Sequence, residues 1–404
     1  LDRLVTPLGA NAPSGQTNVA FVHHGNQGLA YSDVFAGRSG AEGASGFDEI
    51  LRLHEQKNVP GNFHLAATLQ TSAEWNHQNG DPLDFNGWLR TGVTNGWAAM
   101  LTSAYAQPIM PFLQGAMNDW AIDRDVAMVT TRYGYVPHVA WVPERCFLDP
   151  STYPNAGVID WSGAHWQAHG VNGVVVDDWP HCAGHNPHQI HFLQGNGLRL
   201  IPRDSDFTGR LHSGDGAGAL AILTNEANSG VGQYRITVYA DDWEMAAAVG
   251  GWETTFPYAF GTYQWIIDKC STESAWLHTW KLDAALGNPD FDGDTFTPTY
   301  GTYGGIGDVN GYGGGDNAWY SHWAGYVPYS TGGDGNGNCG GGGNCKNHGT
   351  LWNDAHAALQ AAPDNKIRET GWYVLMTNLH ETGWHDYLGG PISGWQRQYS
   401  AHIK

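Results

Sequence analysis

The stretch YVPHVAWVPERCF, residues 135–147, is the part of the sequence on which the expected fold depends. Its apolar first half, Tyr135 to Val142, predicts a buried strand, and Glu144 follows that strand directly. A second predicted strand, Tyr234 to Ala240, runs into Asp241 and Asp242 in the same way. Carboxylates at the ends of two buried strands indicate an active site that uses two acids.

Strands and helices alternate along the sequence on both sides of this stretch. Alternation of this kind predicts a parallel sheet or barrel, whose functional groups gather at the carboxyl ends of the strands. We expect further strands at Asn18–Val22, Gly61–Leu69, Ala98–Ala104, Gly173–Val176 and Leu198–Pro202, and helices at Phe47–Lys57, Ile122–Tyr133 and from about Glu244.

The pattern changes beyond Trp252 to helical stretches at Tyr258–Cys270 and Leu351–Leu359. Between them, the segment Gly287–Gly349 is dominated by Gly, Asp, Asn and Tyr. A loop this long is usually functional or disordered. We interpret it as an insertion that serves as a lid, a binding surface or a contact between subunits.

The composition excludes several classes of partner. The chain has 39 acidic and 19 basic residues and a net charge of -20, which repels nucleic acid and anionic lipid. No apolar run is long enough to span a membrane. Charged residues make up only 14% of the chain, whereas Gly, Trp and Tyr are abundant. Such a surface suits contact with a neutral polymer such as a polysaccharide.

Two features indicate a secreted, extracellular protein. The chain begins at Leu1 rather than Met, which is typical of a processed form, and Cys339 and Cys345 lie close enough in a Gly-rich loop to form a disulfide. The other cysteines have two equal interpretations, one further disulfide with one thiol left over or three buried free thiols. These are Cys146, Cys182 and Cys270.

Five segments, in order, resemble the motifs of glycoside hydrolase family 57, whose members cleave or transfer alpha-glucans. Trp141–Glu144 and Asp242–Glu244 are similar to the third and fourth motifs and carry most of the resemblance. The remaining three segments are His24–Gly28, Thr102–Ile109 and His380–Asp386, which are similar to the first, second and fifth motifs.

The resemblance implies an α/β fold, an incomplete (β/α)7 barrel followed by a C-terminal helical region with the long Gly/Asn/Asp-rich insertion. It implies a catalytic barrel at 1–255 and, at 256–404, a helical region that completes the active site, with the insertion at about 287–349. It also implies no catalytic metal. Asn26 and Gln107 stand where the family usually has His, which leaves the substrate open.

The resemblance assigns the nucleophile to Glu144 and the general acid/base to Asp242. Retaining glycosidases hold two such carboxyl groups about 5 Å apart. Asp242 needs a raised pKa to keep its proton, and the neighbouring Asp241, Glu244 and Trp243 would raise it by like charge and desolvation. Two structural roles compete with these assignments: Glu144 could form an ion pair with Arg145, and Asp242 could cap a helix. Asp241 is the main rival of Asp242 for the role of the acid.

Other polar and aromatic residues of the motifs are expected to contact the substrate. His23 or His24 would hydrogen-bond sugar hydroxyls, and Trp rings would stack on sugar faces, although core packing is the usual role of a Trp. The predicted substrate-binding residues are His23, His24, Asn26, Gln27, Trp141, Asp241, Trp243, Glu244, His380, Glu381, Trp384 and His385.

Two segments are rich in metal-ligand residues. The segment Asp177–His191 contains many histidines but matches no known zinc pattern, so we favour solvent-exposed or hydrogen-bonded histidines over a surface metal. The second segment favours structural Ca²⁺ and plain solvated turns equally, and its spacing is not that of an EF-hand. Its candidate ligands are Asp290, Asp292, Asp294 and Asp308.

The sequence therefore predicts a retaining glycosidase or glycosyltransferring enzyme that acts on alpha-glucans or a related polysaccharide and requires no cofactor for catalysis. Water or a sugar would accept the glycosyl group. The alternative is an extracellular structural, filament-forming or carbohydrate-binding protein with weak or no catalysis. The insertion and the altered first and second motifs favour this alternative. That alternative includes a homo-oligomer or filament.

Overall fold

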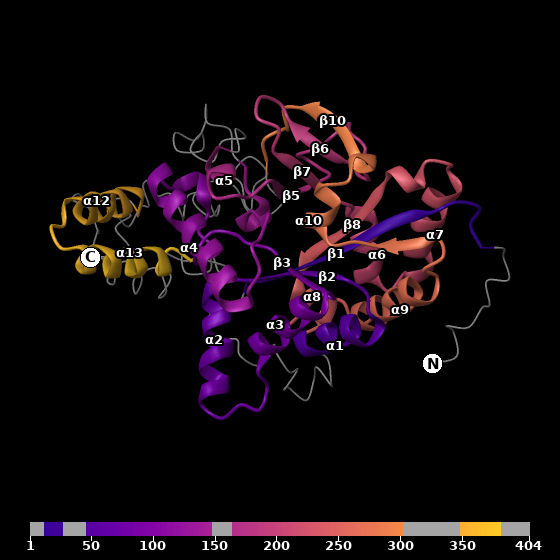
Figure 1. Cartoon of the computed structure of the whole chain (residues 1–404), viewed down its shortest axis with the longest axis horizontal. Coiled ribbons are helices and arrows are strands. Elements are labelled where there is room, and N and C mark those ends of the chain that lie inside the picture. Colours follow the sequence, from indigo (N-terminus) through magenta and orange to yellow (C-terminus); the bar gives the residue numbers. More distant parts are fainter. Residues whose placement is uncertain (1–11, 27–45, 148–163, 302–347, 381–404) are drawn as a thin grey trace.

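Seven parallel strands form the centre of the molecule (Figure 1). The computed structural model describes residues 12–26, 46–147, 164–301 and 348–380. The strands neighbour one another in the order β8-β1-β2-β3-β4-β5-β7. They are β1 (Thr17–Gly25), β2 (Gly61–Leu65), β3 (Ala98–Met100), β4 (Val139–Trp141), β5 (Gly173–Asp177), β7 (Arg199–Arg203) and β8 (Ile236–Asp242).

The ring of strands is only partly closed. Between β3 and β4, the bonding is a parallel bridge of Thr102 with Ala140, in which the Trp141 N–H donates to the Thr102 carbonyl at 2.9 Å. Between β7 and β8, the Asp204 N–H donates to the Val238 carbonyl at 2.9 Å. The fold is therefore an incomplete (β/α)7 barrel, which confirms the prediction.

Three short strands extend the sheets. β9 (Leu277–Thr279) pairs with the start of β1, β6 (Ile190–Leu193) runs antiparallel to β7, and β10 (Asp292–Phe296) runs parallel to β6. Because β9 and β10 follow residue 255, both predicted domains contribute strands to the sheets. The division into 1–255 and 256–404 stays a prediction.

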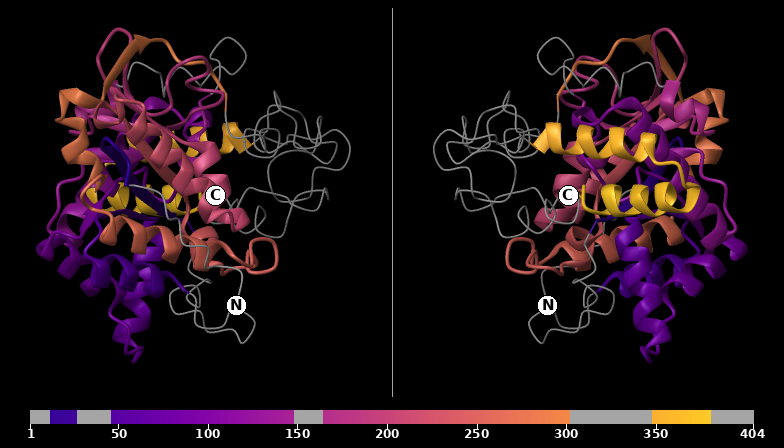
Figure 2. Two further views of the ribbon diagram at one scale, coloured as in Figure 1. Left: turned by 90° about the vertical axis from the view of Figure 1, so that its right-hand side faces the viewer. Right: turned by 90° about the vertical axis from the view of Figure 1, so that its left-hand side faces the viewer.

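Helices cover the outside of the barrel (Figure 1). In the described part of the chain, α12 and α13 lie at the end of the molecule opposite α7 (Figure 1) and run side by side (Figure 2). None of the described helices is long and apolar enough to cross a membrane. The helices are α1 (Phe47–Lys57), α2 (Ala67–Gln78), α3 (Phe85–Asn95), α4 (Gly115–Tyr133), α5 (Ala164–Ala168), α6 (Ser205–Ser213), α7 (Gly216–Asn228), α8 (Trp243–Ala247), α9 (Ala259–Thr272), α10 (Leu282–Leu286), α12 (His348–Ala361) and α13 (Asn365–Thr377).

Aspartate side chains cap the starts of four of these helices, among them α3, where Asp84 accepts from the Gly87 N–H. Asp204 accepts from the Phe207 N–H at the start of α6, and Asp215 caps α7 in the same way. Asp364 accepts from two backbone N–H groups at the start of α13. Each such cap satisfies donors that the first turn leaves without partners and stabilises its helix by about 1 kcal/mol.

Strand β1 is buried on both faces and separates two parts of the core. Ala20 and Val22 belong to the cluster inside the barrel. Val19 and Phe21 belong to the cluster between the sheet and the helices, where they pack among side chains of α1, α8 and α9. A strand buried on both faces is typical of a parallel sheet covered by helices.

Most predicted elements are present, with changed ends. Helix α1 has the predicted bounds Phe47–Lys57. The predicted strand Gly61–Leu69 is wrong beyond Leu65, because α2 begins at Ala67, and the predicted strand at 135–142 is reduced to Val139–Trp141. The predicted insertion at about 287–349 contains β10, and its residues from 302 to 347 lie outside the described part.

The described cysteines are buried free thiols. This finding confirms the second interpretation of Cys146, Cys182 and Cys270. Cys339 and Cys345, for which we predict a disulfide, lie outside the described residues.

Candidate active site

Polar side chains gather at the carboxyl ends of the barrel strands. Because parallel strands end at the same edge, side chains far apart in the sequence meet there. The residues that end or directly follow these strands include His24, His64, Glu144, Asp177, Arg203, Asp241 and Asp242.

Glu144 lies in a strained turn directly after β4. It belongs to a 3₁₀ turn, Pro143–Arg145, and its φ of 54° is in the left-handed region that non-glycine residues rarely adopt. Arg145 shares this conformation, with φ 45°. Each such residue costs on the order of 1–3 kcal/mol and is found mostly where function requires an unusual direction. The Asn26 amide donates to Glu144 Oε1 at 3.5 Å.

Arg145 pairs with Asp177 from β5. Its Nε donates to Asp177 Oδ1 at 2.8 Å, and both side chains are buried. The guanidinium also lies 4.8 Å from the centre of the Trp141 ring. An ion pair between Glu144 and Arg145, the structural alternative for Glu144, stays a prediction.

Asp241 and Asp242 end β8 but have different surroundings. Asp241 Oδ2 lies 3.2 Å from the Arg203 guanidinium, and its Oδ1 accepts from the Asp242 N–H at 2.9 Å. Asp242 occupies the N-cap position of α8, yet its side chain makes no capping hydrogen bond. The alternative of Asp242 as a helix cap is therefore wrong for its side chain.

The electrostatic surroundings separate the two carboxyl groups. Burial raises the pKa of Asp241, but Arg203, His212 and Arg145 outweigh it, so the net pKa is lowered and the group is ionised. Burial raises the pKa of Asp242 well above its ordinary value. Three carboxylates raise it further, with only Arg145 opposing them; they belong to Glu244, Asp241 and Glu144.

His24 faces the barrel interior. It lies beside Asp242 in the pairing of β1 with β8 and beside His64 in the pairing of β1 with β2. The Nδ1 atoms of His24 and His64 are 2.8 Å apart, so one nitrogen donates to the other. The His24 ring stacks on Trp141 at 4.4 Å, and its buried Nε2 has no hydrogen-bond partner among the described residues.

Trp141 is fully buried beneath this ring and beside Arg145. The sequence predicts it as a surface for sugar stacking. In the structure its contacts are with protein groups, and it supports His24.

His23 and Trp243 lie on the other face of the sheet. His23 Nε2 is 2.7 Å from the Tyr263 hydroxyl, which also lies 2.7 Å from His54 Nε2. Trp243 is fully buried and stacks on Phe47 at 4.7 Å. The structure therefore places both residues in the core between sheet and helices, away from the other predicted substrate-binding residues.

His380 reaches the site from the far end of the chain. It follows α13, is buried, and lies near enough to His24 to influence its charge. Burial lowers the pKa of His380 to about 4, although a hydrogen bond with the Asn26 backbone opposes the shift. Its ring is therefore neutral at pH 7. The other predicted residues of this region and of the first motif lie outside the described residues; they are Gln27, Glu381, Trp384 and His385.

The structure adds site residues that sequence reasoning did not identify. Asp177 and Arg203 hold Arg145 and Asp241 in place, and His64 contacts His24. Each of the three is the last or the second-last residue of its strand. A polar residue at the end of a predicted strand was the available signal.

The aspartates predicted to bind calcium face different partners. Asp292 pairs with Arg199, whereas Asp294 Oδ2 is 3.0 Å from His185 Nδ1. Asp290 is exposed, and Asp308 lies outside the described residues. The calcium site stays a prediction.

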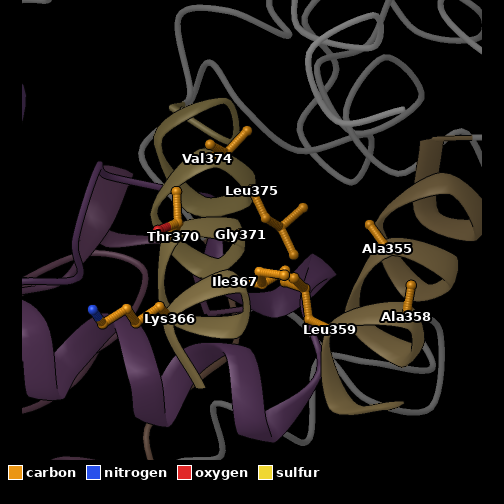
Figure 3. A pocket seen from close by; sticks show the side chains of 9 residues that line it. All are labelled: Ala355, Ala358, Leu359, Lys366, Ile367, Thr370, Gly371, Val374 and Leu375. Atoms are coloured by element: carbon orange, nitrogen blue, oxygen red, sulfur yellow. The ribbon is translucent and has the colours of Figure 1, made fainter. Parts of the chain in front are cut away.

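A separate groove of about 510 Å³ lies between α12 and α13 (Figure 3). Leu359, Ile367 and Leu375 line it, and Gly371 allows close approach, since a Cβ there would lie 2.2 Å from Leu359 Cδ2. The groove is mainly apolar. It contains none of the carboxyl groups described above.

Neither a protein-family model nor a curated protein sequence matches the chain. Several solved structures, however, are similar to the structure of this chain. The chain is similar to a 4-alpha-glucanotransferase from Thermococcus litoralis, with a TM-score of 0.70 and 15% identity over 96% of this chain and 59% of that one. It therefore spans less than two thirds of that enzyme.

Two further enzymes have a similar structure. A GH57 branching enzyme from Thermococcus kodakaraensis has a TM-score of 0.64 and 10% identity, over 96% of this chain and 88% of that one. An alpha-amylase from Thermotoga maritima has a TM-score of 0.58 and 10% identity, over 96% and 92%. The chain thus has the fold of glycoside hydrolase family 57, which confirms the resemblance that its five motifs indicate.

Proposed function

We propose that this chain is a retaining glycosidase or glucanotransferase that acts on alpha-glucans or a related polysaccharide. The observation that carries the proposal is the buried position of Asp242 at the end of β8, near Glu144 and two other carboxylates, which raises the pKa of Asp242 well above its ordinary value. A protonated acid next to a carboxylate nucleophile is the pair that retaining enzymes use. The structural neighbours, which act on alpha-glucans, support the substrate class.

In the first step, a Glu144 oxygen attacks the anomeric carbon, and the bond to the glycosidic oxygen breaks as Asp242 gives that oxygen its proton. The products are a glycosyl ester on Glu144 and a released sugar. In the second step, Asp242 takes a proton from water or from a sugar hydroxyl, whose oxygen attacks the anomeric carbon and frees Glu144.

The surrounding residues have supporting roles in this proposal. Asn26 orients Glu144 through its amide, and the strained turn directs the carboxylate away from the path of β4. His24 Nε2 binds a sugar hydroxyl, because it is a buried polar atom without a hydrogen-bond partner in the described part of the chain. Arg203 keeps Asp241 ionised, so that Asp242 alone carries the proton.

The test is product analysis with maltoheptaose and amylose. We expect Glu144→Gln and Asp242→Asn to lower product formation by roughly 10³-fold or more, since each removes a group that acts in the transition state. Matched controls are Glu369→Gln and Asp206→Asn, whose side chains are 57% and 65% exposed and far less buried than the site carboxyls.

Two results would contradict the proposal. One is full activity in the Glu144→Gln and Asp242→Asn variants. The other is binding of maltoheptaose by the unaltered chain without any product, which would instead support the alternative of a carbohydrate-binding protein. Oligosaccharides longer than the substrate among the products would identify transfer rather than hydrolysis.

A further inference from the structure

Apart from the proposed catalytic carboxyl groups, a cluster of metal-ligating side chains lies where β6 meets β10, at the edge of the sheet. Among the described residues, His185, His191 and Asp294 each offer a ligand atom, and these atoms lie within 4.8 Å of one another. We propose that these three residues form a Zn²⁺ site with water as the fourth ligand. The site is independent of the proposed catalytic carboxylates.

His191 already has the arrangement of a metal ligand. It is buried, and its Nε2 is 2.8 Å from the Asn186 carbonyl, so Nε2 carries the proton and Nδ1 presents a lone pair. Metal-binding histidines typically donate their second N–H to a carbonyl in this way, which fixes the tautomer and the ring. Nδ1 accepts from the Asp294 N–H at 3.0 Å, and the metal takes the place of that N–H.

His185 and Asp294 complete the set from the solvent side. His185 Nδ1 lies 3.0 Å from Asp294 Oδ2, and the His185 ring stacks on Phe296 with ring centres 3.6 Å apart. Phe296 also contacts the His191 ring edge-on at 5.2 Å. Both imidazoles are therefore held in place before a metal arrives. The Asp294 side chain is 65% exposed, which leaves an approach for the metal and room for water.

Gly293 lets strand β10 pass close to the His191 ring. A Cβ at this position would lie 2.5 Å from His191 Nδ1, closer than any contact allows. The pairing of β10 with β6 also shifts register between Asp292 and Thr295, and this irregularity places Asp294 beside the histidines. The register shift and the missing Cβ at Gly293 together bring Asp294 next to His191 Nδ1.

The donor set selects the metal. Two imidazole nitrogens and one carboxylate suit Zn²⁺, whereas Ca²⁺ and Mg²⁺ require oxygen ligands. Tetrahedral zinc bonds of about 2.0–2.2 Å place neighbouring ligand atoms about 3.4 Å apart. The ligand atoms lie within 4.8 Å of one another, and the partly exposed His185 and exposed Asp294 side chains can move to reach that spacing.

Zinc at this position would join distant parts of the chain. His185 and Asp294 are 109 residues apart in sequence, and β10 is otherwise held to β6 by a short parallel pairing. We expect the metal to stabilise this pairing, by the linkage that favours any state that binds a ligand.

The experiment uses the full chain, stripped with a chelator and titrated with Zn²⁺ or Ca²⁺ in a calorimeter. We expect one Zn²⁺ per chain, no Ca²⁺ at this cluster, and a rise in melting temperature with Zn²⁺. His185→Asn and Asp294→Asn should each weaken Zn²⁺ binding by about tenfold or more and abolish the rise. Co²⁺ should give the absorption bands of a four-coordinate ion.

His165→Asn is the matched control, since His165 is also a partly exposed histidine paired with an aspartate, Asp119, in another part of the molecule. It should leave Zn²⁺ binding unchanged. Both ligand variants alter partly exposed side chains, and their melting temperatures without metal report whether they fold. Equal Zn²⁺ affinity in folded His185→Asn and Asp294→Asn chains, or loss of binding in His165→Asn, would overturn the proposal.

Discussion

Asp241 and Asp242 are neighbours in the chain, yet the structure shifts the pKa values of their carboxyl groups in opposite directions. Burial raises the pKa of Asp241, but Arg203, whose guanidinium lies 3.2 Å away, outweighs burial together with His212 and Arg145, so the net pKa is lowered. The negative charge of Asp241 is then one of the causes that raise the pKa of Asp242. The ion pair thus decides which of the two residues is suited to act as the acid.

The pH dependence of activity should report this arrangement. Glu244 is the strongest of the carboxylates that raise the pKa of Asp242. Replacing it, as Glu244→Gln, removes a like charge and lowers the pKa of Asp242, so the acid loses its proton at a lower pH. We expect the alkaline side of the profile of kcat/KM to move to lower pH. An unchanged profile would show that Asp242 does not set that side; Glu369→Gln is the control.

His64 should affect catalysis through His24. His64→Phe keeps a flat ring beside His24 but removes the nitrogen 2.8 Å from His24 Nδ1. Loss of one buried hydrogen bond of about 1.4 kcal/mol corresponds to about a tenfold fall in kcat/KM. His64→Asn, which retains a donor, should recover part of it. Wild-type kinetics for His64→Phe would contradict a positioning role.

The hydroxyl of Tyr263 should matter for stability rather than for catalysis. His54 Nδ1 donates to the Val59 carbonyl, so the Tyr263 hydroxyl donates to His54 Nε2 and accepts from His23 Nε2. Tyr263→Phe leaves both imidazoles without this partner, and we expect the free energy of unfolding to fall by about 2–4 kcal/mol.

Tyr133→Phe provides the comparison for that measurement. Tyr133 is equally buried but donates one hydrogen bond, to Asn86 at 2.8 Å, so its loss should cost about half as much. Urea denaturation measures both variants. Equal losses, or a large loss of activity in folded Tyr263→Phe, would contradict the prediction.

His188 predicts how stability depends on pH. Burial lowers its pKa, but hydrogen bonds to Asp204 at 2.7 Å and to Glu226 at 3.2 Å outweigh burial and raise it to about 9. The charged ring therefore stabilises the fold, on the order of 3 kcal/mol, at pH values below its unfolded pKa of about 6.5. This stabilisation is lost as the pH rises through about 9.

We expect His188→Gln to be less stable than the unaltered chain at pH 6 and nearly equal to it at pH 10. Chemical denaturation across this range measures the difference. A gap between the two proteins that stays constant with pH would show that the charge of His188 contributes little.

The sequence predicts the position of the acids but not the orientation of every motif residue. Glu144 and Asp242 follow predicted strands, and parallel strands end together, so their proximity was predictable. Whether His23 or His24 faces the interior was not, because β1 is apolar on both faces. Alternation along such a strand carries no information about direction.

Contacts between distant residues explain the elements that the sequence pattern did not reveal. β10 contains Asp and Gly, which disfavour strands, and it is held by the partners of Asp292 and Asp294 near β6. Likewise, Arg145 pairs with Asp177 from the next strand, 32 residues away in sequence. A local pattern cannot report such pairs.

The position of His380 has a consequence for the order in which the molecule becomes complete. During synthesis, the strands up to β8 leave the ribosome well before α13, and domains fold progressively from the N-terminus. Helix α13 is held against α4 by Trp372, which stacks on Trp120, and only then can His380 meet the Asn26 backbone. A nascent chain therefore contains Glu144 and Asp242 long before His380 joins them. The candidate active site becomes complete only when α13 docks against α4.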